Sequence, residues 1–217
     1  MVDSSSRQRP RNPLPRAVLF DCLGTLVRLE PPAPRLAERL GVALPAAETA
    51  IRAEIAHYRA GMHRAVDAAS LATLRAECAA VVAEALGRSC SVEDLLAAIV
   101  FTPYPDAAPC LVALRGAGAR CVVVSNWDVS LHEVLRRTGL APLLDGAVSS
   151  AEAGRAKPDP EPVRQALRLA GVAPADAWLV GDEPGADIGA ARAAGVRPIL
   201  IDRARGDTLT ALLWEAG

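Results

Sequence analysis

Short apolar runs bounded by turn residues recur along the chain and indicate buried strands of a parallel sheet. The five runs lie at 17–20, 120–125, 146–149, 177–180 and 197–201. Segments whose apolar residues have helical spacing lie between them, at 107–115, 129–137, 160–170 and 186–194. Because strand and helix alternate, the pattern predicts an α/β fold, a doubly wound, Rossmann-like parallel sheet with right-handed crossovers.

The alternation is interrupted from residue 31 to 102, where no strand-like run appears and alanine, leucine, arginine and glutamate dominate. Pro45 suits the first turn of one helix in this stretch. A second helix is predicted by an apolar stripe that ends before Gly87 and consists of Leu71, Leu74, Cys78, Val81, Val82 and Leu86. Ser91 to Asp94 resembles a capping box at the start of a further helix.

This helical insertion divides the chain into three predicted parts. A helical cap at 31–102 is inserted into a core formed by 15–30 and 103–217, and residues 1–14 form a basic, disordered tail. Because the insertion leaves the sheet just after the first strand, we expect it to lie over the carboxyl ends of the strands, where it can act as a lid.

Composition and charge narrow the class of partner. The chain has 217 residues, 51% of them hydrophobic, which is ample for a buried core. Its net charge of -1, from 24 basic and 25 acidic side chains, gives no field that favours nucleic acid or an anionic membrane. We therefore expect a small-molecule substrate, and a monomer or homodimer.

Cysteine spacing and the N-terminal residues indicate the compartment. Five cysteines without a C-x-x-C pair favour neither a disulfide framework nor a zinc site. The first fifteen residues lack the apolar core of a signal peptide, and no run reaches membrane-spanning length. These features predict a cytoplasmic protein.

Asp21 stands where the first apolar run stops and a turn containing Gly24 and Thr25 begins. The carboxyl end of a buried parallel strand is where such a sheet presents its ligand site. Asp21 is therefore the candidate reactive group. Leu23 occupies the position, two residues later, where many enzymes with this type of motif carry a second acid.

Three more signals follow along the chain. Ser125 and Asn126 come after the second strand, near a helix start that suits an anion, although such residues are more often helix caps. Lys157 lies in a proline-stiffened loop and offers a compact charge for phosphate or carboxylate, or is a solvated surface lysine. Asp182 and Asp187 follow the fourth strand, where carboxylates can bind Mg²⁺, although Asp187 can equally serve the helix terminus.

An Asp loop, a Ser, a Lys and an acidic pair in this order resemble the haloacid dehalogenase (HAD) superfamily, and the resemblance extends from Ala17 to Asp202. The helical insertion is similar to the type-one cap of subfamily IA in that superfamily. The phrases at 125–128 and 157–160 resemble its many bacterial hydrolases of undefined substrate. The resemblance implies a hydrolase, and favours a phosphatase that acts on a small phosphorylated metabolite.

By that resemblance, Asp21 is the nucleophile and forms an aspartyl-phosphate intermediate that water resolves. Ser125 donates a hydrogen bond to the transferring group, and Lys157 neutralises oxygens of the nucleophile and the phosphate. The implied Mg²⁺ ligands are Asp21, the backbone carbonyl of Leu23, Asp182 and Asp187. The implied substrate-binding residues are Gly24, Thr25, Asn126 and Arg52.

Leu23 departs from the phosphatases of the superfamily, in which an Asp at this position protonates the leaving oxygen and then activates water. Such general acid–base help is typically worth about 10²–10⁴-fold. Because halide leaves without a proton, a metal-independent 2-haloacid dehalogenase is the first alternative, and Arg52 resembles the arginine that binds substrate in those enzymes. The second alternative is a catalytically impaired binding protein. The retained carboxylates repel one another without a cation, so the sequence favours Mg²⁺ and phosphoryl chemistry.

The insertion offers replacements for the missing acid. His57, Tyr58 and His63 are titratable side chains clustered in one segment of it. We hypothesise that one of them takes the role of the acid absent at Leu23. The alternative is that they lie on the surface of the cap or fill its core.

Overall fold

The computed structural model describes residues 14–211, and its core is the predicted parallel sheet. The predicted tail lies outside the described residues apart from Leu14. The strands run in the order β5-β4-β1-β6-β7. Their bounds are β1 Ala17–Phe20, β4 Arg120–Ser125, β5 Gly146–Ser149, β6 Ala177–Gly181 and β7 Arg197–Leu200. All five predicted strands are confirmed to within one residue at each end.

The register of the sheet brings the ends of its central strands together. β1 pairs in parallel with β4 on one side and with β6 on the other. Its last residue, Phe20, lies opposite Val123 and Val180. Because the three strands run in one direction, the residues that follow them lie at a single edge of the sheet, where open α/β sheets bind ligands.

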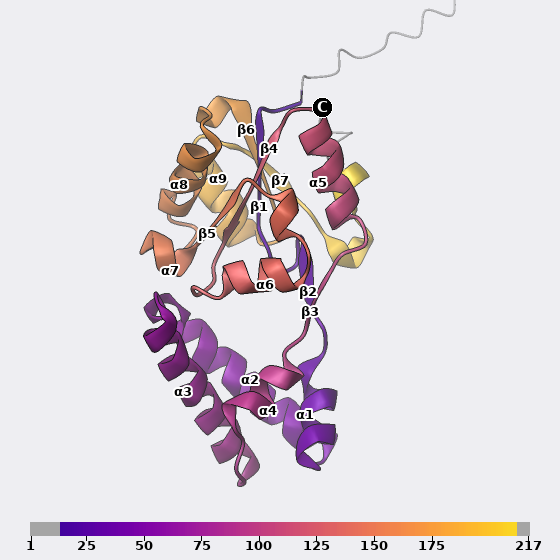
Figure 1. Cartoon of the computed structure of the whole chain (residues 1–217), viewed down its shortest axis with the longest axis vertical. Helices are drawn as coiled ribbons and strands as arrows, with labels where there is room; N and C mark the ends of the chain where they lie inside the picture. The colour runs from indigo at the N-terminus through magenta and orange to yellow at the C-terminus, as the bar shows by residue number, and fades with distance from the viewer. Residues whose placement is uncertain (1–13, 212–217) are drawn as a thin grey trace, which may run out of the picture.

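Helices cover both faces of the sheet (Figure 1). Their bounds are α5 Ala107–Gly116, α6 Leu131–Arg137, α7 Ser150–Ala153, α8 Glu161–Ala170 and α9 Gly189–Ala193. The helices predicted at 107–115, 129–137 and 160–170 are confirmed with small shifts of their ends. The helix predicted at 186–194 is wrong in its first part, because a π-helical turn at Pro184–Ile188 precedes α9. In that turn Asp187 accepts a hydrogen bond from the Glu183 amide at 3.0 Å, a local contact that competes with regular helix.

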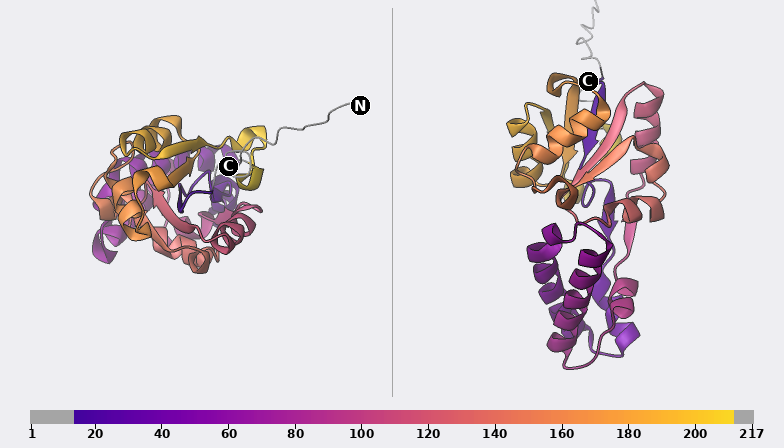
Figure 2. Two further views of the ribbon diagram at one scale, coloured as in Figure 1. Left: turned by 90° about the horizontal axis from the view of Figure 1, so that it is seen from above. Right: turned by 60° about the vertical axis from the view of Figure 1, so that its left-hand side comes forward.

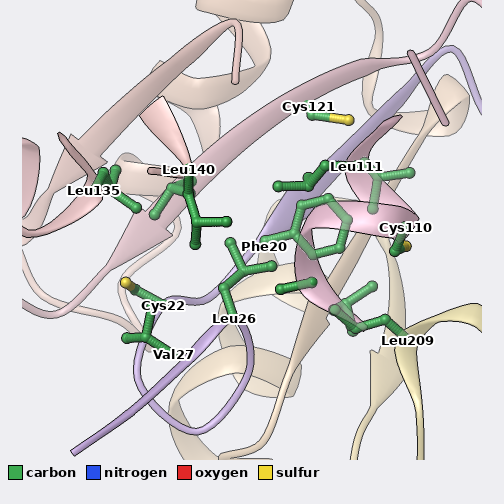
Figure 3. Close-up of a cluster of buried hydrophobic side chains, with 14 of the residues drawn as sticks. Phe20, Cys22, Leu26, Val27, Cys110, Leu111, Cys121, Leu135, Leu140 and Leu209 are labelled. Atoms are coloured by element: carbon green, nitrogen blue, oxygen red, sulfur yellow. The ribbon is translucent and has the colours of Figure 1, made fainter. Parts of the chain in front are cut away.

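Successive side chains of β1 face opposite sides of the sheet. Val18 and Phe20 belong to one hydrophobic cluster, on the side of α5 and α6. Ala17 and Leu19 belong to a second cluster, on the side of α8 and α9. Figure 3 shows Phe20 and its neighbours in the first cluster. The core therefore has three layers, and the predicted α/β fold class is confirmed.

A bundle of four helices within the described chain lies beyond the carboxyl ends of the strands (Figure 1). The bounds are α1 Pro32–Leu40, α2 Leu44–Gly61, α3 Ala68–Leu86 and α4 Val92–Ala98. The bundle has a hydrophobic cluster of its own. Pro45 stands in the first turn of α2, Gly87 is the left-handed C-cap of α3, and Ser91 and Asp94 form the predicted capping box of α4. Over residues 14–211, no helix combines the length and the apolar character needed to cross a membrane.

Two short strands that the sequence pattern did not predict join the bundle to the core (Figure 2). β2 Val27–Leu29 and β3 Phe101–Pro103 pair antiparallel. The expectation that 31–102 holds no strand is therefore wrong at its end, where β3 begins. Strands of three residues are too short to show a period of two, and these form because folding brings the two ends of the insertion together.

Candidate active site

Asp21 is the first residue after β1 and lies buried at the carboxyl edge of the sheet. Its amide donates to the Val180 carbonyl at 2.9 Å, which fixes the backbone at this point. One side-chain oxygen, Oδ1, accepts from the Ser125 hydroxyl at 3.0 Å and from the Lys157 ammonium at 2.7 Å. Neither group bonds Oδ2, so the carboxylate is held through one oxygen and the other is available.

Lys157 reaches Asp21 from the loop between α7 and α8, and its side chain is 1% exposed. An ammonium has three N–H donors. Here they contact Asp21 Oδ1 at 2.7 Å, Asp187 Oδ1 at 2.5 Å and the Val124 carbonyl at 2.7 Å. Burial alone would lower the pKa of Lys157, but Asp21 and Asp187 raise it above its ordinary value, so the side chain is charged.

The residue type at position 157 is informative in itself. Lys157 is the single lysine of the sequence, and the other basic residues are arginines. A compact ammonium can meet three acceptors around one point, whereas a planar guanidinium distributes its donors over a fork. The site therefore specifies lysine rather than positive charge in general.

Asn126 supports the lysine loop. Its side-chain amide donates to the Lys157 carbonyl at 2.9 Å, and its side-chain oxygen accepts from the Lys157 amide at 2.7 Å. Both ends of the amide group are thus engaged by one backbone residue. A direct contact of Asn126 with substrate stays a prediction.

Three carboxylates converge beside the lysine. Oxygens of Asp21, Asp182 and Asp187 lie within 4.8 Å of one another. Asp182 follows β6, and Asp187 comes from the π-helical turn. Two glycines make room for them: a Cβ on Gly24 would collide with the Asp182 carboxylate, and a Cβ on Gly181 with that of Asp187. Gly24 also has a φ of 85°, which other residues rarely adopt.

The charges of this cluster are unbalanced. Burial raises the pKa of Asp21 although Lys157 opposes the shift, and Asp187 adds to it. Burial, together with Asp21 and Asp187, raises the pKa of Asp182 to about 6. Lys157 pairs with Asp21 and Asp187, and among residues 14–211 no salt bridge is formed to Asp182. Three carboxylates against one ammonium leave two negative charges unbalanced, and such a cluster of hard oxygen donors is suited to a divalent cation such as Mg²⁺.

The turn at 22–26 carries the remaining predicted residues. Leu23 is 38% exposed, in contrast to the buried groups around it. Thr25 is buried, its carbonyl accepts from Arg203 Nη2 at 2.5 Å, and its hydroxyl has no hydrogen-bond partner among the described residues. The Gly24 amide donates to the Val27 carbonyl. Metal binding by the Leu23 carbonyl and substrate binding by Gly24 and Thr25 stay predictions.

Arg52, His57 and His63 of the bundle have surroundings separate from the carboxylate cluster. Arg52 is exposed on α2 and donates to Thr49 of the same helix at 2.9 Å. His57 is paired with Glu77 of α3 at 3.1 Å, and His63 is exposed.

Tyr58 alone among the proposed acids contacts the core. Its hydroxyl donates to Asp128 Oδ2 at 2.9 Å, next to a second contact in which the Val129 amide donates to the Ala65 carbonyl at 3.0 Å. Burial, with the neighbouring Asp128 carboxylate, raises the pKa of Tyr58 far above its ordinary value. Tyr58 therefore links the bundle to the loop that follows Ser125 at the end of β4. Sequence reasoning missed its partner Asp128, three residues after Ser125.

We expect Lys157→Met to lower the free energy of unfolding of the metal-free protein by about 3–5 kcal/mol, because it leaves two buried carboxylates without their cation. Urea denaturation in EDTA measures this change. Arg155→Met removes an exposed charge from the same loop and should change the free energy by less than about 0.5 kcal/mol. Equal unfolding midpoints for the two variants would mean that the lysine does not neutralise the cluster.

Comparison with known proteins places this geometry in context. The family model described as haloacid dehalogenase-like hydrolase matches residues 15–195. A phosphoglycolate phosphatase from Rhodospirillum rubrum is 32% identical over 205 residues, covering 87% of this chain and 79% of the relative. A phosphoserine phosphatase from Thermus thermophilus is 41% identical over 101 residues, or 46% of this chain. That second match spans only 41% of the length of the relative.

The solved structures similar to this chain include a dehalogenase as well as phosphatases. The crystal structure of an L-2-haloacid dehalogenase is 28% identical to this chain with a TM-score of 0.66. The match covers 87% of this chain and 84% of the dehalogenase. The chain is therefore similar to proteins of both classes, and the choice between them depends on the residues of the site.

Proposed function

The chain belongs to the haloacid dehalogenase-like hydrolase family, and from that membership we propose that it is a Mg²⁺-dependent phosphatase of a small phosphorylated metabolite. The observation that carries the proposal is the cluster of Asp21, Asp182 and Asp187 beside a single ammonium, which pairs with the buried Asp21 and Asp187 and leaves the partly buried Asp182 unpaired among the described residues. Three negative charges against one positive charge favour a divalent cation over an empty or neutral site. The phosphoserine phosphatase and the phosphoglycolate phosphatase among the relatives support the substrate class.

In this proposal Asp21 Oδ2 attacks the phosphorus atom, because Oδ1 is engaged by Ser125 and Lys157. The bond from phosphorus to the leaving oxygen breaks as the bond to Asp21 forms, and water later releases phosphate and restores the carboxylate. Lys157 keeps Asp21 and Asp187 in place throughout. The Ser125 hydroxyl donates a hydrogen bond to Asp21 and, in the proposed reaction, to the transferring group.

The proposed metal ligands are Asp21, Asp182 and the Leu23 carbonyl, with help from Asp187. Bound Mg²⁺ supplies positive charge that offsets the repulsion between the Asp21 carboxylate and the phosphate. Both oxygens of Asp187 already accept hydrogen bonds, from Lys157 and from the Glu183 amide. Asp187 therefore orients the lysine as well as contributing to the field at the cation.

The bundle α1–α4 is proposed to be a cap that covers the substrate. Its contacts with the core through Tyr58 and Ala65 support a position over the carboxyl edge of the sheet. His57 faces Glu77 instead, which weakens the case for His57 as the proton donor. Without an acid at Leu23, we propose that the enzyme prefers phosphate esters whose leaving oxygen departs without a proton.

A dehalogenase is the second candidate function. Leu23, which cannot donate a proton, and the similarity to an L-2-haloacid dehalogenase favour it. The retained Asp182 opposes it, because a metal-independent reaction can use Asp21 as its nucleophile but leaves the charge of Asp182 uncompensated beside Asp21 and Asp187. A protein that binds Mg²⁺ or phosphate without turnover is the remaining candidate.

One assay separates these candidates. Purified protein is tested for phosphate release from a panel of phosphomonoesters, with Mg²⁺ and with EDTA, and for halide release from 2-haloacids. Phosphate release that requires Mg²⁺ is the expected result. Metal-independent halide release would overturn the proposal, and Mg²⁺ binding without either product would favour the binding protein.

Metal binding can be followed without turnover in the same preparation. Protons and Mg²⁺ compete for Asp182, whose pKa of about 6 lies well above that of an ordinary carboxyl group. The carboxylate is therefore charged above that pH and increasingly neutral below it. The rise in melting temperature caused by Mg²⁺ should shrink as the pH is lowered through this value.

A further inference from the structure

Arg203 joins its own segment to two others, residues 104–106 and the turn at 22–26 that follows Asp21, which we call the catalytic turn. It lies in the 3₁₀ turn Arg203–Arg205 after β7, and its side chain is 13% exposed. Nη2 donates to the Thr25 carbonyl at 2.5 Å. Nη1 donates to Asp106 Oδ2 at 2.8 Å and to the Asp207 carbonyl at 3.1 Å. The guanidinium also stacks 4.0 Å above the ring of Tyr104.

The turn at 22–26 has internal bonds that define its shape. The Gly24 amide donates to the Val27 carbonyl at 2.8 Å, and the Leu26 amide donates to the Cys22 carbonyl at 2.9 Å. The Leu26 bond lies within the turn, and the Gly24 bond joins the turn only to the start of β2, so neither bond fixes the turn against Asp182. The Thr25 hydroxyl, which has no partner among the described residues, does not fix it either.

Bonds from outside the turn set its position. The Tyr104 amide donates to the Leu26 carbonyl at 2.9 Å, and Arg203 donates to the Thr25 carbonyl. The two residues that donate these bonds, Tyr104 and Arg203, pack against each other, because the Arg203 guanidinium lies on the Tyr104 ring. Arg203 therefore supports both connections.

Packing on this side of the turn is incomplete. A cavity of ≈ 360 Å³ is lined by Gly24, Asp182, Tyr104 and Arg203, among others. Gly24 faces Asp182 so closely that a Cβ would collide with the carboxylate. A displacement of the turn therefore changes the distance between Gly24 and Asp182 directly, and the open space beside them leaves room for such a movement away from Asp182.

We propose that Arg203 is a positioning residue for the catalytic turn, fixing residues 22–26 against Asp182 through the Thr25 carbonyl. It acts on the geometry of the carboxylate cluster without contacting substrate, since both Nη atoms are engaged by protein groups. For turnover the inference rests on the proposed phosphatase function. Its effect on metal affinity is independent of that function, because Asp182 and the turn are brought together whichever substrate is used.

The test compares Arg203→Met and Arg203→Lys with Arg205→Met, a control that removes an exposed arginine two residues away. Calorimetry measures the Mg²⁺ dissociation constant of each protein, and initial rates give kcat and KM for the best substrate of the unaltered protein. Arg203→Met should lower kcat on the order of 10–100-fold, as a small misplacement of reacting groups does. KM should change by less than about twofold, because no substrate contact is lost.

Mg²⁺ affinity should weaken in Arg203→Met in parallel with kcat, and Arg203→Lys should recover part of both, because its ammonium can still donate to the Thr25 carbonyl. Values of kcat and Mg²⁺ affinity equal to those of Arg205→Met would overturn the proposal, even if stability fell. A change confined to KM would overturn it too, since it would place Arg203 at the substrate.

Misfolding of a variant and failure of the proposed function can each be distinguished from failure of the proposed role of Arg203. If Arg203→Met does not fold, Arg203→Lys carries the same comparison. If the unaltered protein releases no phosphate from any ester, the proposed function fails, while the Mg²⁺ affinities of the variants still decide the role of Arg203.

Discussion

Asp21→Asn is expected to lower Mg²⁺-dependent phosphate release by at least about 10⁴-fold, because an amide oxygen is a poor nucleophile and the two-step route through Asp21 is lost. The shape of the side chain is kept. Its oxygen can still accept from Ser125 and Lys157, which now contact Oδ1 at 3.0 and 2.7 Å. The loss should therefore come from chemistry rather than from misfolding. Initial rates at saturating Mg²⁺ and substrate measure it.

Stability gives a check on that interpretation. Burial and Asp187 raise the pKa of Asp21 against the effect of Lys157, which means that its negative charge is unfavourable in the folded protein. Removing that charge should leave the unfolding midpoint of the metal-free protein unchanged or higher. Asp176→Asn is the matched control, because Asp176 precedes β6 at the end of the strand opposite to Asp182. This variant should release phosphate at the rate of the unaltered protein. Substantial phosphate release by Asp21→Asn would exclude Asp21 as the nucleophile.

Site residues that stand at the carboxyl ends of strands could be predicted from the sequence. Asp21, Ser125 and Asp182 each stand at or just after the carboxyl end of a buried apolar run, and parallel register alone brings such residues to one edge. For Lys157 and Asp187 the sequence pattern leaves two roles open, because a lone lysine or aspartate usually has an ordinary surface or capping role. The structure brings both of them to Asp21.

Contacts between distant segments were not predictable in this way. β2 and β3 are too short to carry a periodic signal, and they pair across the whole insertion. Arg203 is one of many arginines in the sequence, and only the fold reveals that it bonds the Thr25 carbonyl. The contact of Tyr58 with Asp128 likewise depends on how the bundle lies against the core. These features arise from tertiary packing, whereas Asp21, Ser125 and Asp182 follow from local pattern and strand direction.

Leu23→Asp is expected to raise phosphate release from alkyl phosphate esters by about 10²–10⁴-fold, the usual contribution of a general acid–base group. The new carboxyl group can protonate the leaving oxygen and then activate the water that resolves the intermediate. Leu23 is 38% exposed, so little packing is lost when it is replaced. The gain should be smaller for aryl and acyl phosphates, whose leaving groups need no proton. Rates over a series of esters with different leaving-group pKa measure both effects.

Leu23→Asn is the matched control for this gain, because asparagine has nearly the size of aspartate and cannot transfer a proton at neutral pH. The logarithm of kcat for the unaltered protein and for Leu23→Asn should fall steeply as the leaving-group pKa rises, whereas for Leu23→Asp the slope should be shallow. An equal gain in both variants would trace the effect to the loss of the leucine side chain. No gain in Leu23→Asp, in protein that still binds Mg²⁺, would mean that position 23 does not face the leaving group. The absence of an acid there would then not explain which substrates this chain can use.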